Sequence, residues 1–182
     1  MKQFLTGNVL LILCCIFYLA WWIIAFRPTG AVKGMKSGWL LIPAAVFGIA
    51  AVVIIAGAIS ATDNAAQLVP TMYIVGIGAA GYVILLLGTW MLMKRPVTTE
   101  LVLIVGWATL AAAEISALYG HEVYTAGAAW VFIAIVVILA VVSLVCYLLY
   151  YQLDAVAGYY DGIIPLVIVA VVMAAMNLTI VI

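Results

Sequence analysis

The sequence predicts an all-α membrane protein, a polytopic bundle of six transmembrane helices in one membrane domain that covers residues 1–182. Hydrophobic residues make up 71% of the chain and charged residues only 7%, whereas soluble domains are about 45–50% apolar and about 25% charged. The apolar residues also occur in long runs, and roughly 20 apolar residues are enough for a helix to cross the hydrocarbon core. We therefore expect this chain to be embedded in a lipid bilayer.

Six apolar runs are long enough to span a bilayer, and they cover residues 8–26, 39–60, 70–93, 98–119, 124–151 and 163–182. Proline placement supports three of these starts, because Pro70, Pro96 and Pro165 fall within about two residues of a predicted helix start, where a missing N–H costs nothing. Pro43 lies within the second run, so that helix is expected to begin near Ile42 or to kink there. No small-residue cleavage site follows the first run, which we expect to be retained as a span.

Positive residues indicate the orientation of the chain, because lysine and arginine favour cytoplasmic loops. The loops after the first and third runs hold five of the six: Arg27, Lys33, Lys36, Lys94 and Arg95. Lys2 is the exception. This distribution predicts that both termini lie outside. In size, span number and terminus placement the chain is similar in layout to small bacterial channels for urea and short amides, although no run of residues aligns with them. We expect a bacterial plasma (inner) membrane.

The fourth run carries four conspicuous side chains at a spacing of seven residues: Glu100, Trp107, Glu114 and His121. With 3.6 residues per turn each seven-residue step drifts by only about 20°, so all four are expected along one side of the helix. A carboxylate facing lipid is costly, and we expect Glu114 to face the bundle and to be protonated or hydrogen-bonded. Two interpretations stay open for it: a neutral contact between helices, or a group that lines a solute or proton path.

Asn177 is the expected hydrogen-bond partner of Glu114, because both lie at a similar depth below the outer end of their helices at about 1.5 Å per residue. Cys14, Cys15 and Trp130 are further candidates for this polar layer. Glu100 is expected to stabilise a helix N-terminus. The residues that we consider for a solute or proton path are Glu114, Asn177, Trp107, Glu100 and His121. His121 is expected in a solvated loop, with pH sensing as its alternative role. We expect Asp154 and Asp161 to be solvated loop acids on the cytoplasmic side.

Several classes of chemistry are disfavoured by the residues present. No lysine lies in mid-span for a retinal Schiff base, and a single histidine cannot supply two haem ligands. The three cysteines lie inside apolar runs, where thiols usually act as small hydrophobes. The sequence also lacks the cluster of basic residues that is typical of nucleic-acid-binding proteins. We therefore predict no cofactor, no metal and no catalytic residues.

These observations predict a small channel or transporter for a neutral or cationic small solute, either alone or linked to proton movement. The alternatives are a non-catalytic membrane subunit of a larger complex, or an integral-membrane enzyme that acts on lipid or quinone. Small residues such as Gly76, Gly78 and Ala80 in the third run, and Gly106 in the fourth, predict close helix packing. We accordingly expect a homo-oligomer or a membrane partner besides the lipid bilayer and the solute.

Overall fold

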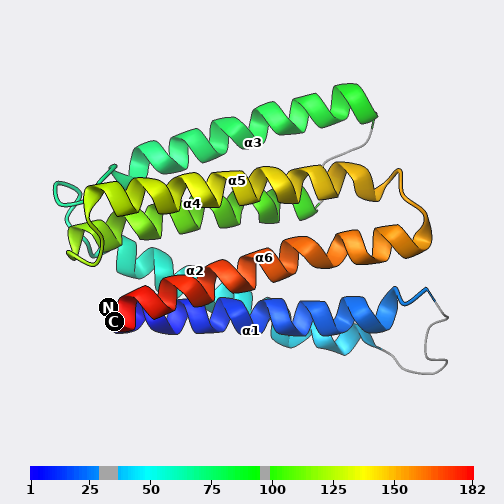
Figure 1. Cartoon of the computed structure of the whole chain (residues 1–182), viewed down its shortest axis with the longest axis horizontal. Coiled ribbons are helices and arrows are strands. Elements are labelled where there is room, and N and C mark those ends of the chain that lie inside the picture. The colour runs from blue at the N-terminus through cyan, green and yellow to red at the C-terminus, as the bar shows by residue number, and fades with distance from the viewer. Residues whose placement is uncertain (29–36, 95–98) are drawn as a thin grey trace. The chain divides into compact units, whose positions relative to one another are not determined.

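A computed structural model describes residues 1–28, 37–94 and 99–182, and these form an all-α protein without strands (Figure 1). Six α-helices and one short 3-10 helix follow one another along the described chain: α1 (Lys2–Ala25), η1 (Ser37–Leu40), α2 (Leu41–Ser60), α3 (Thr71–Met93), α4 (Thr99–Gly120), α5 (Ala126–Tyr150) and α6 (Ala155–Val181). Each α-helix, with η1 counted into α2, is long and apolar enough to cross a bilayer. The described chain is therefore a multi-pass membrane protein of the predicted fold class.

Most predicted boundaries agree with the helices to within two residues, but α1 and α6 both begin earlier than expected. α1 begins at Lys2 instead of residue 8, and α6 begins at Ala155 instead of residue 163. The early start of α6 has a local cause, because Asp154 caps it: its Oδ1 accepts hydrogen bonds from the backbone N–H groups of Val156 at 2.9 Å and Ala157 at 2.8 Å. An aspartate at this position satisfies two of the N–H groups that a helix start leaves open.

Two of the described prolines lie at helix starts, and Pro165 does not. Pro70 is the N-cap of α3, and Pro43 is the third residue of α2, where no intrahelical partner needs its N–H. Pro165 contradicts the prediction, because it lies in the interior of α6. It cannot donate to the carbonyl of Asp161 four residues earlier, and such a gap is tolerated in a transmembrane helix where neighbouring groups compensate. Pro96 lies outside the described residues.

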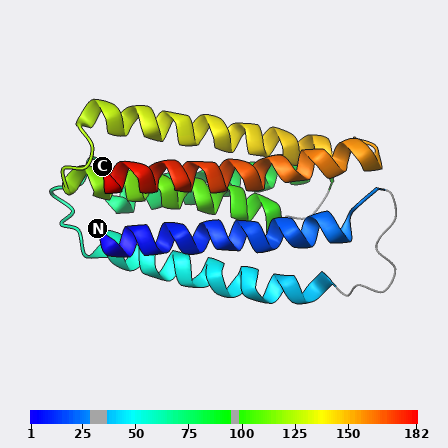
Figure 2. The same ribbon diagram turned by 60° about the horizontal axis from the view of Figure 1, so that its bottom comes forward.

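The chain divides into two compact units, and the first comprises residues 1–58 and 145–182. Within it, α1 packs against the antiparallel α6, so the N- and C-termini lie at the same end of this pair (Figure 1). α2 lies along the other flank of α1 (Figure 2), where Phe17 stacks on Phe47 with ring centroids 5.6 Å apart. Cys14 Sγ lies against Gly48 in the same contact.

The second unit comprises residues 59–144 and contains α3, α4 and most of α5. α3 packs against α4, and Gly78 lies against the side chain of Thr109. A glycine is required there because a Cβ would overlap the threonine hydroxyl. Thr109 is itself held by a 2.8 Å hydrogen bond from Oγ1 to the Val105 carbonyl. The single membrane domain expected from the sequence stays a prediction.

Candidate functional site

Glu114 lies in the most buried stretch of the protein and does not face lipid. Its side chain has no exposed surface, and the surrounding positions of α4 from residue 113 to 118 are all 3% exposed or less. Half of the most apolar stretch of α4 is buried, compared with 6–22% for the other spans. Glu114 is six residues from the end of α4 at Gly120, which is about 9 Å along the helix axis. The carboxyl group is thus enclosed by protein at shallow depth.

The seven-residue stripe of α4 is buried in its middle and exposed at both ends. Trp107 is 8% exposed and lies about 10 Å from Glu114 along the helix axis. Its indole Nε1–H has no hydrogen-bond acceptor among the described residues. Glu100 and His121 are both exposed. Of the four predicted positions, α4 therefore brings only Glu114 and Trp107 onto a buried face.

His121 belongs to a hydrogen-bonded cap over the end of α4. Its Nε2 lies 3.1 Å from the hydroxyl of Thr62, in the connection between α2 and α3. Ser116 holds the same connection more firmly: its Oγ donates to the Val69 carbonyl at 2.7 Å and accepts from the Val69 N–H at 2.9 Å. Gln67 adds two hydrogen bonds at the end of this connection, because its side-chain oxygen accepts from the N–H and the hydroxyl of Thr71. Residues 61–70 are thus folded onto α4 close to Glu114.

Asn177 is half-buried in α6, about 6 Å from the end of that helix. It belongs to the first unit and Glu114 belongs to the second, so the hydrogen bond between them stays a prediction. Of the other residues considered for the polar layer, Cys15 is buried and Cys14 is half-buried, whereas Trp130 is 53% exposed. Trp130 therefore presents most of its surface outward, which is typical of an interfacial tryptophan.

Asn8 is a buried polar residue that the sequence interpretation missed. It is 0% exposed in α1 and lies about 9 Å from the helix start at Lys2. The expected first span began at residue 8, which left Asn8 at its edge and so without apparent significance. The signal was available in the stretch Thr6-Gly7-Asn8, because a polar residue that continues into an apolar run has to find a partner inside the protein.

Asp161 corrects a second expectation, because it is not a solvated loop acid. The early start of α6 places it within the span, where it is 9% exposed. The thiol of Cys146 in α5 lies near its carboxyl group and interacts with it electrostatically, and its Oδ2 has no partner among the described residues. Asp154, the other acid of that pair, is exposed as expected and caps the helix.

An aromatic cluster surrounds this part of the first unit. Trp22 of α1 donates from Nε1 to the backbone carbonyl of Tyr159 at 3.1 Å, and its ring lies against Gly162 of α6. A side chain at position 162 would overlap that ring, so the close approach requires glycine. Trp22 also packs on Tyr150 of α5, with ring centroids 5.7 Å apart. The Asp161 region is therefore tightly closed by contacts from three helices.

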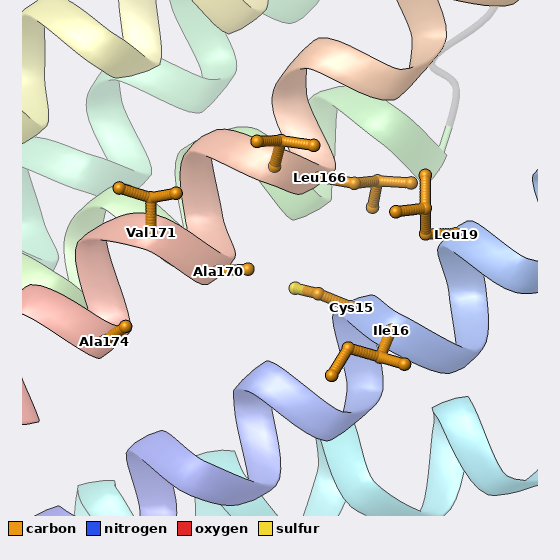
Figure 3. Close-up of a pocket in the computed structure, with 8 residues that line it drawn as sticks. Cys15, Ile16, Leu19, Leu166, Ala170, Val171 and Ala174 are labelled. Carbon is orange, nitrogen blue, oxygen red and sulfur yellow. The ribbon is translucent and has the colours of Figure 1, made fainter.

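An apolar groove of about 210 Å³ lies between α1 and α6 (Figure 3). The sulfur of Cys15 points across it toward Ala170. The lining is almost entirely aliphatic and comprises Cys15, Ile16, Leu19, Leu166, Val167, Ala170, Val171 and Ala174. Because a polar solute needs hydrogen-bond partners that this groove does not offer, we do not place a solute path here.

The described residues contain no group of three or more His, Cys, Asp or Glu side chains that could hold a metal ion. Lys2, Arg27 and Lys94, the basic residues of the described part, are all exposed at helix ends or just beyond them. Lys33, Lys36 and Arg95, on which the predicted orientation also depends, lie outside the described residues. No protein-family model, curated protein or solved structure matches the chain.

Proposed function

We propose that this protein is a small channel or transporter for a neutral or cationic small solute, and that solute movement is linked to protons through Glu114. The observation that carries the proposal is the complete burial of Glu114 in α4. An acid inside a membrane span is costly and is a functional candidate for that reason. The bacterial inner membrane and outside termini are part of the proposal, supported by Arg27 and Lys94 after α1 and α3.

The polar groups of the proposed path lie at two depths. In a chain whose six spans alternate in direction, Asn8, Glu114 and Asn177 each come within about 6–9 Å of the outer end of their helix. Trp107 follows about 10 Å deeper on α4. Its buried N–H is costly without an acceptor, and a passing solute oxygen would supply one. Glu114 and Trp107 of the second unit thus give the proposed path an acid and an indole donor.

The charges of the described spans favour the proposed class of solute. The buried acids are Glu114 and Asp161, and the basic side chains stay at helix ends. A buried carboxylate attracts cations and tolerates neutral hydrogen-bonding solutes, but it repels anions in a medium of low dielectric constant. We therefore expect small amides or ammonium-type cations to pass and carboxylate anions of similar size to be rejected.

The test is solute flux in proteoliposomes at about pH 5 and about pH 8, a range in which a buried acid can titrate. Urea, methylammonium and acetate serve as neutral, cationic and anionic probes. Glu114→Gln keeps the size of the side chain and removes its charge, and we expect methylammonium flux to fall about tenfold or more, which corresponds to about 1.4 kcal/mol in the barrier. The pH dependence should disappear as well.

Glu100→Gln is the matched control, because it removes an exposed acid from the same helix. Wild-type fluxes are expected in this variant. Equal fluxes of wild type and Glu114→Gln at both pH values would overturn the role of Glu114. Acetate flux as fast as methylammonium flux would contradict the proposed selectivity.

The exposed face of α3 favours a second candidate function, that of a membrane subunit. Only 6% of its apolar stretch is buried, and Gly76 and Ala80 are exposed one turn apart. Small residues at this spacing let another helix approach closely in lipid. A homo-oligomer would use the same face, and particle mass in nanodiscs distinguishes a monomer from a homo-oligomer and from a chain that requires a different partner.

A further inference from the structure

Asp161 is a buried acid with a carboxyl oxygen that lacks a hydrogen-bond partner among the described residues. The proposed path through Glu114 does not include it. Asp161 is 9% exposed, and its Oδ2 has no hydrogen-bond partner among the described residues. An ionised carboxylate can accept hydrogen bonds at both oxygens, so a buried carboxylate with one oxygen unsatisfied is unfavourable unless a proton or cation binds it. The second oxygen is therefore the position at which a ligand is expected.

Aromatic contacts close the turns of α6 next to Asp161. Trp22 lies against Gly162, the neighbour of Asp161, and is anchored on the Tyr159 carbonyl. Tyr150 also packs on Trp22. The apolar groove is lined by Leu19 and Leu166, and Asp161 does not line it. A proton is the smallest ligand that can satisfy a buried carboxylate, and it requires no opening of these contacts.

The backbone carbonyl of Asp161 is a second hydrogen-bond acceptor at this position. Pro165 has no N–H, so the carbonyl of Asp161 lacks the helical donor that it would otherwise have. The side chain and the backbone of one residue therefore both present acceptor oxygens within the span. When Oδ2 is protonated it becomes a donor, and this gives the local group of acceptors the hydrogen that the ionised form lacks.

Among the described residues, no cation pairs with the carboxyl group of Asp161. From α5, Cys146 interacts with it electrostatically, and Tyr150 follows one turn further along that helix. Trp22 of α1 and Tyr159 and Tyr160 of α6 belong to the same aromatic cluster. The described charged residues at this helix end, Arg27 and Asp154, are exposed. Within the described part of the chain, a proton is therefore the group that can neutralise Asp161.

We propose that Asp161, beside Cys146, is a proton-binding site within the first turns of α6. Asp161 lies about 9 Å from the start of α6, which is the end that the proposed orientation places on the cytoplasmic side. The carboxylate takes up one proton at Oδ2 and releases it to the same side. This assignment rests on the proposed proton-linked transport and supplies its inner proton site.

The test is infrared difference spectroscopy of the reconstituted full chain, with the proton as probe, over about pH 4 to about pH 9. Protonation of a carboxylate produces a carboxylic C=O stretching band. Asp161→Asn is expected to remove one titrating component of this band, and Asp161→Glu is expected to keep it at a changed frequency. Asp154→Asn is the matched control, because asparagine also caps helices, and it should leave that component unchanged.

Substitutions of Cys146 distinguish a proton-binding Asp161 from an Asp161 with only a structural role. Cys146→Ala removes the thiol donor and Cys146→Ser replaces it with a stronger donor, so the midpoint of the Asp161 component should move in opposite directions in the two variants. An Asp161 component that does not titrate, or a midpoint indifferent to both substitutions, would overturn the proposal. Glu114→Gln should leave this component in place, so a failure here is distinct from a failure of the flux experiment on Glu114.

Discussion

Ser116→Ala offers the sharpest test of how the cap over α4 is held. Ser116 is fully buried, and its hydroxyl makes both a 2.7 Å donor bond and a 2.9 Å acceptor bond to the backbone of Val69. Alanine leaves a carbonyl and an N–H without these partners, and each buried group left unsatisfied costs about 1–3 kcal/mol. Because Val69 is half-buried and water can reach it in part, we expect a total loss of about 2–4 kcal/mol.

Ser143→Ala is the matched control for this experiment. Ser143 is 1% exposed, and its hydroxyl has no hydrogen-bond partner among the described residues. The same substitution at equal burial should therefore change the free energy of unfolding by less than about 0.5 kcal/mol. The two variants differ mainly in the hydrogen bonds that they remove.

The assay combines detergent-driven unfolding, followed by tryptophan fluorescence, with hydrogen exchange of peptides that cover residues 61–70. Exchange matters because the cap can open locally without unfolding the protein, and the loss would then appear only in those peptides. Faster exchange in Ser116→Ala and wild-type exchange in Ser143→Ala are expected. Equal losses of stability in the two variants, or unchanged exchange in residues 61–70, would refute the assignment of the cap to Ser116.

Two further predictions concern packing and the cap. Gly78→Ala is expected to cost about 1–3 kcal/mol in the same unfolding assay, because the new methyl group would overlap Thr109. Gly81→Ala is the control: its Cβ has open space, and the variant should be neutral or more stable by up to about 1 kcal/mol. Similar stability of both variants would contradict the α3–α4 contact. Gln67→Glu places a carboxylate where the Gln67 amide group now donates to the carbonyls of Thr62 at 3.3 Å and Ile59 at 3.5 Å. Folding should therefore raise the pKa of the introduced acid above its unfolded value of about 4.3, so that the variant is destabilised at neutral pH and recovers as the pH falls below that raised value. A loss of stability that stays the same from neutral to acidic pH would count against this hydrogen-bond pattern.

The predicted and observed helices differ where a capping residue decides the boundary. Asp161 and the two tyrosines before it interrupt the apolar pattern, and Pro165 is typical of a helix start, so the sequence pattern favoured a loop there. Asp154 nevertheless starts α6 earlier, and Trp22 binds the Tyr159 carbonyl from a position 137 residues away in the chain. A window of neighbouring residues contains no signal of such a contact.

Helix spacing explains why the stripe on α4 was only partly informative. The seven-residue repeat puts Trp107 and Glu114 on the same side of a helix, because the period of an α-helix is a local property. Burial differs along that side, and Glu100 and His121 are exposed because they lie at the helix ends. Gly106, expected in a packing seam, has open space at its Cβ.

The sequence by itself determined that this protein is embedded in a membrane, how many spans it has and that Glu114 has to be buried. These follow from composition, from the length of apolar runs and from the cost of charge in hydrocarbon, which are properties of single segments. Only the tertiary structure decided that Asp161 is buried inside a span, that Asn8 is buried and that residues 61–70 fold onto α4. Each of these depends on which helices meet, because a polar group in lipid is satisfied by a partner that another segment supplies.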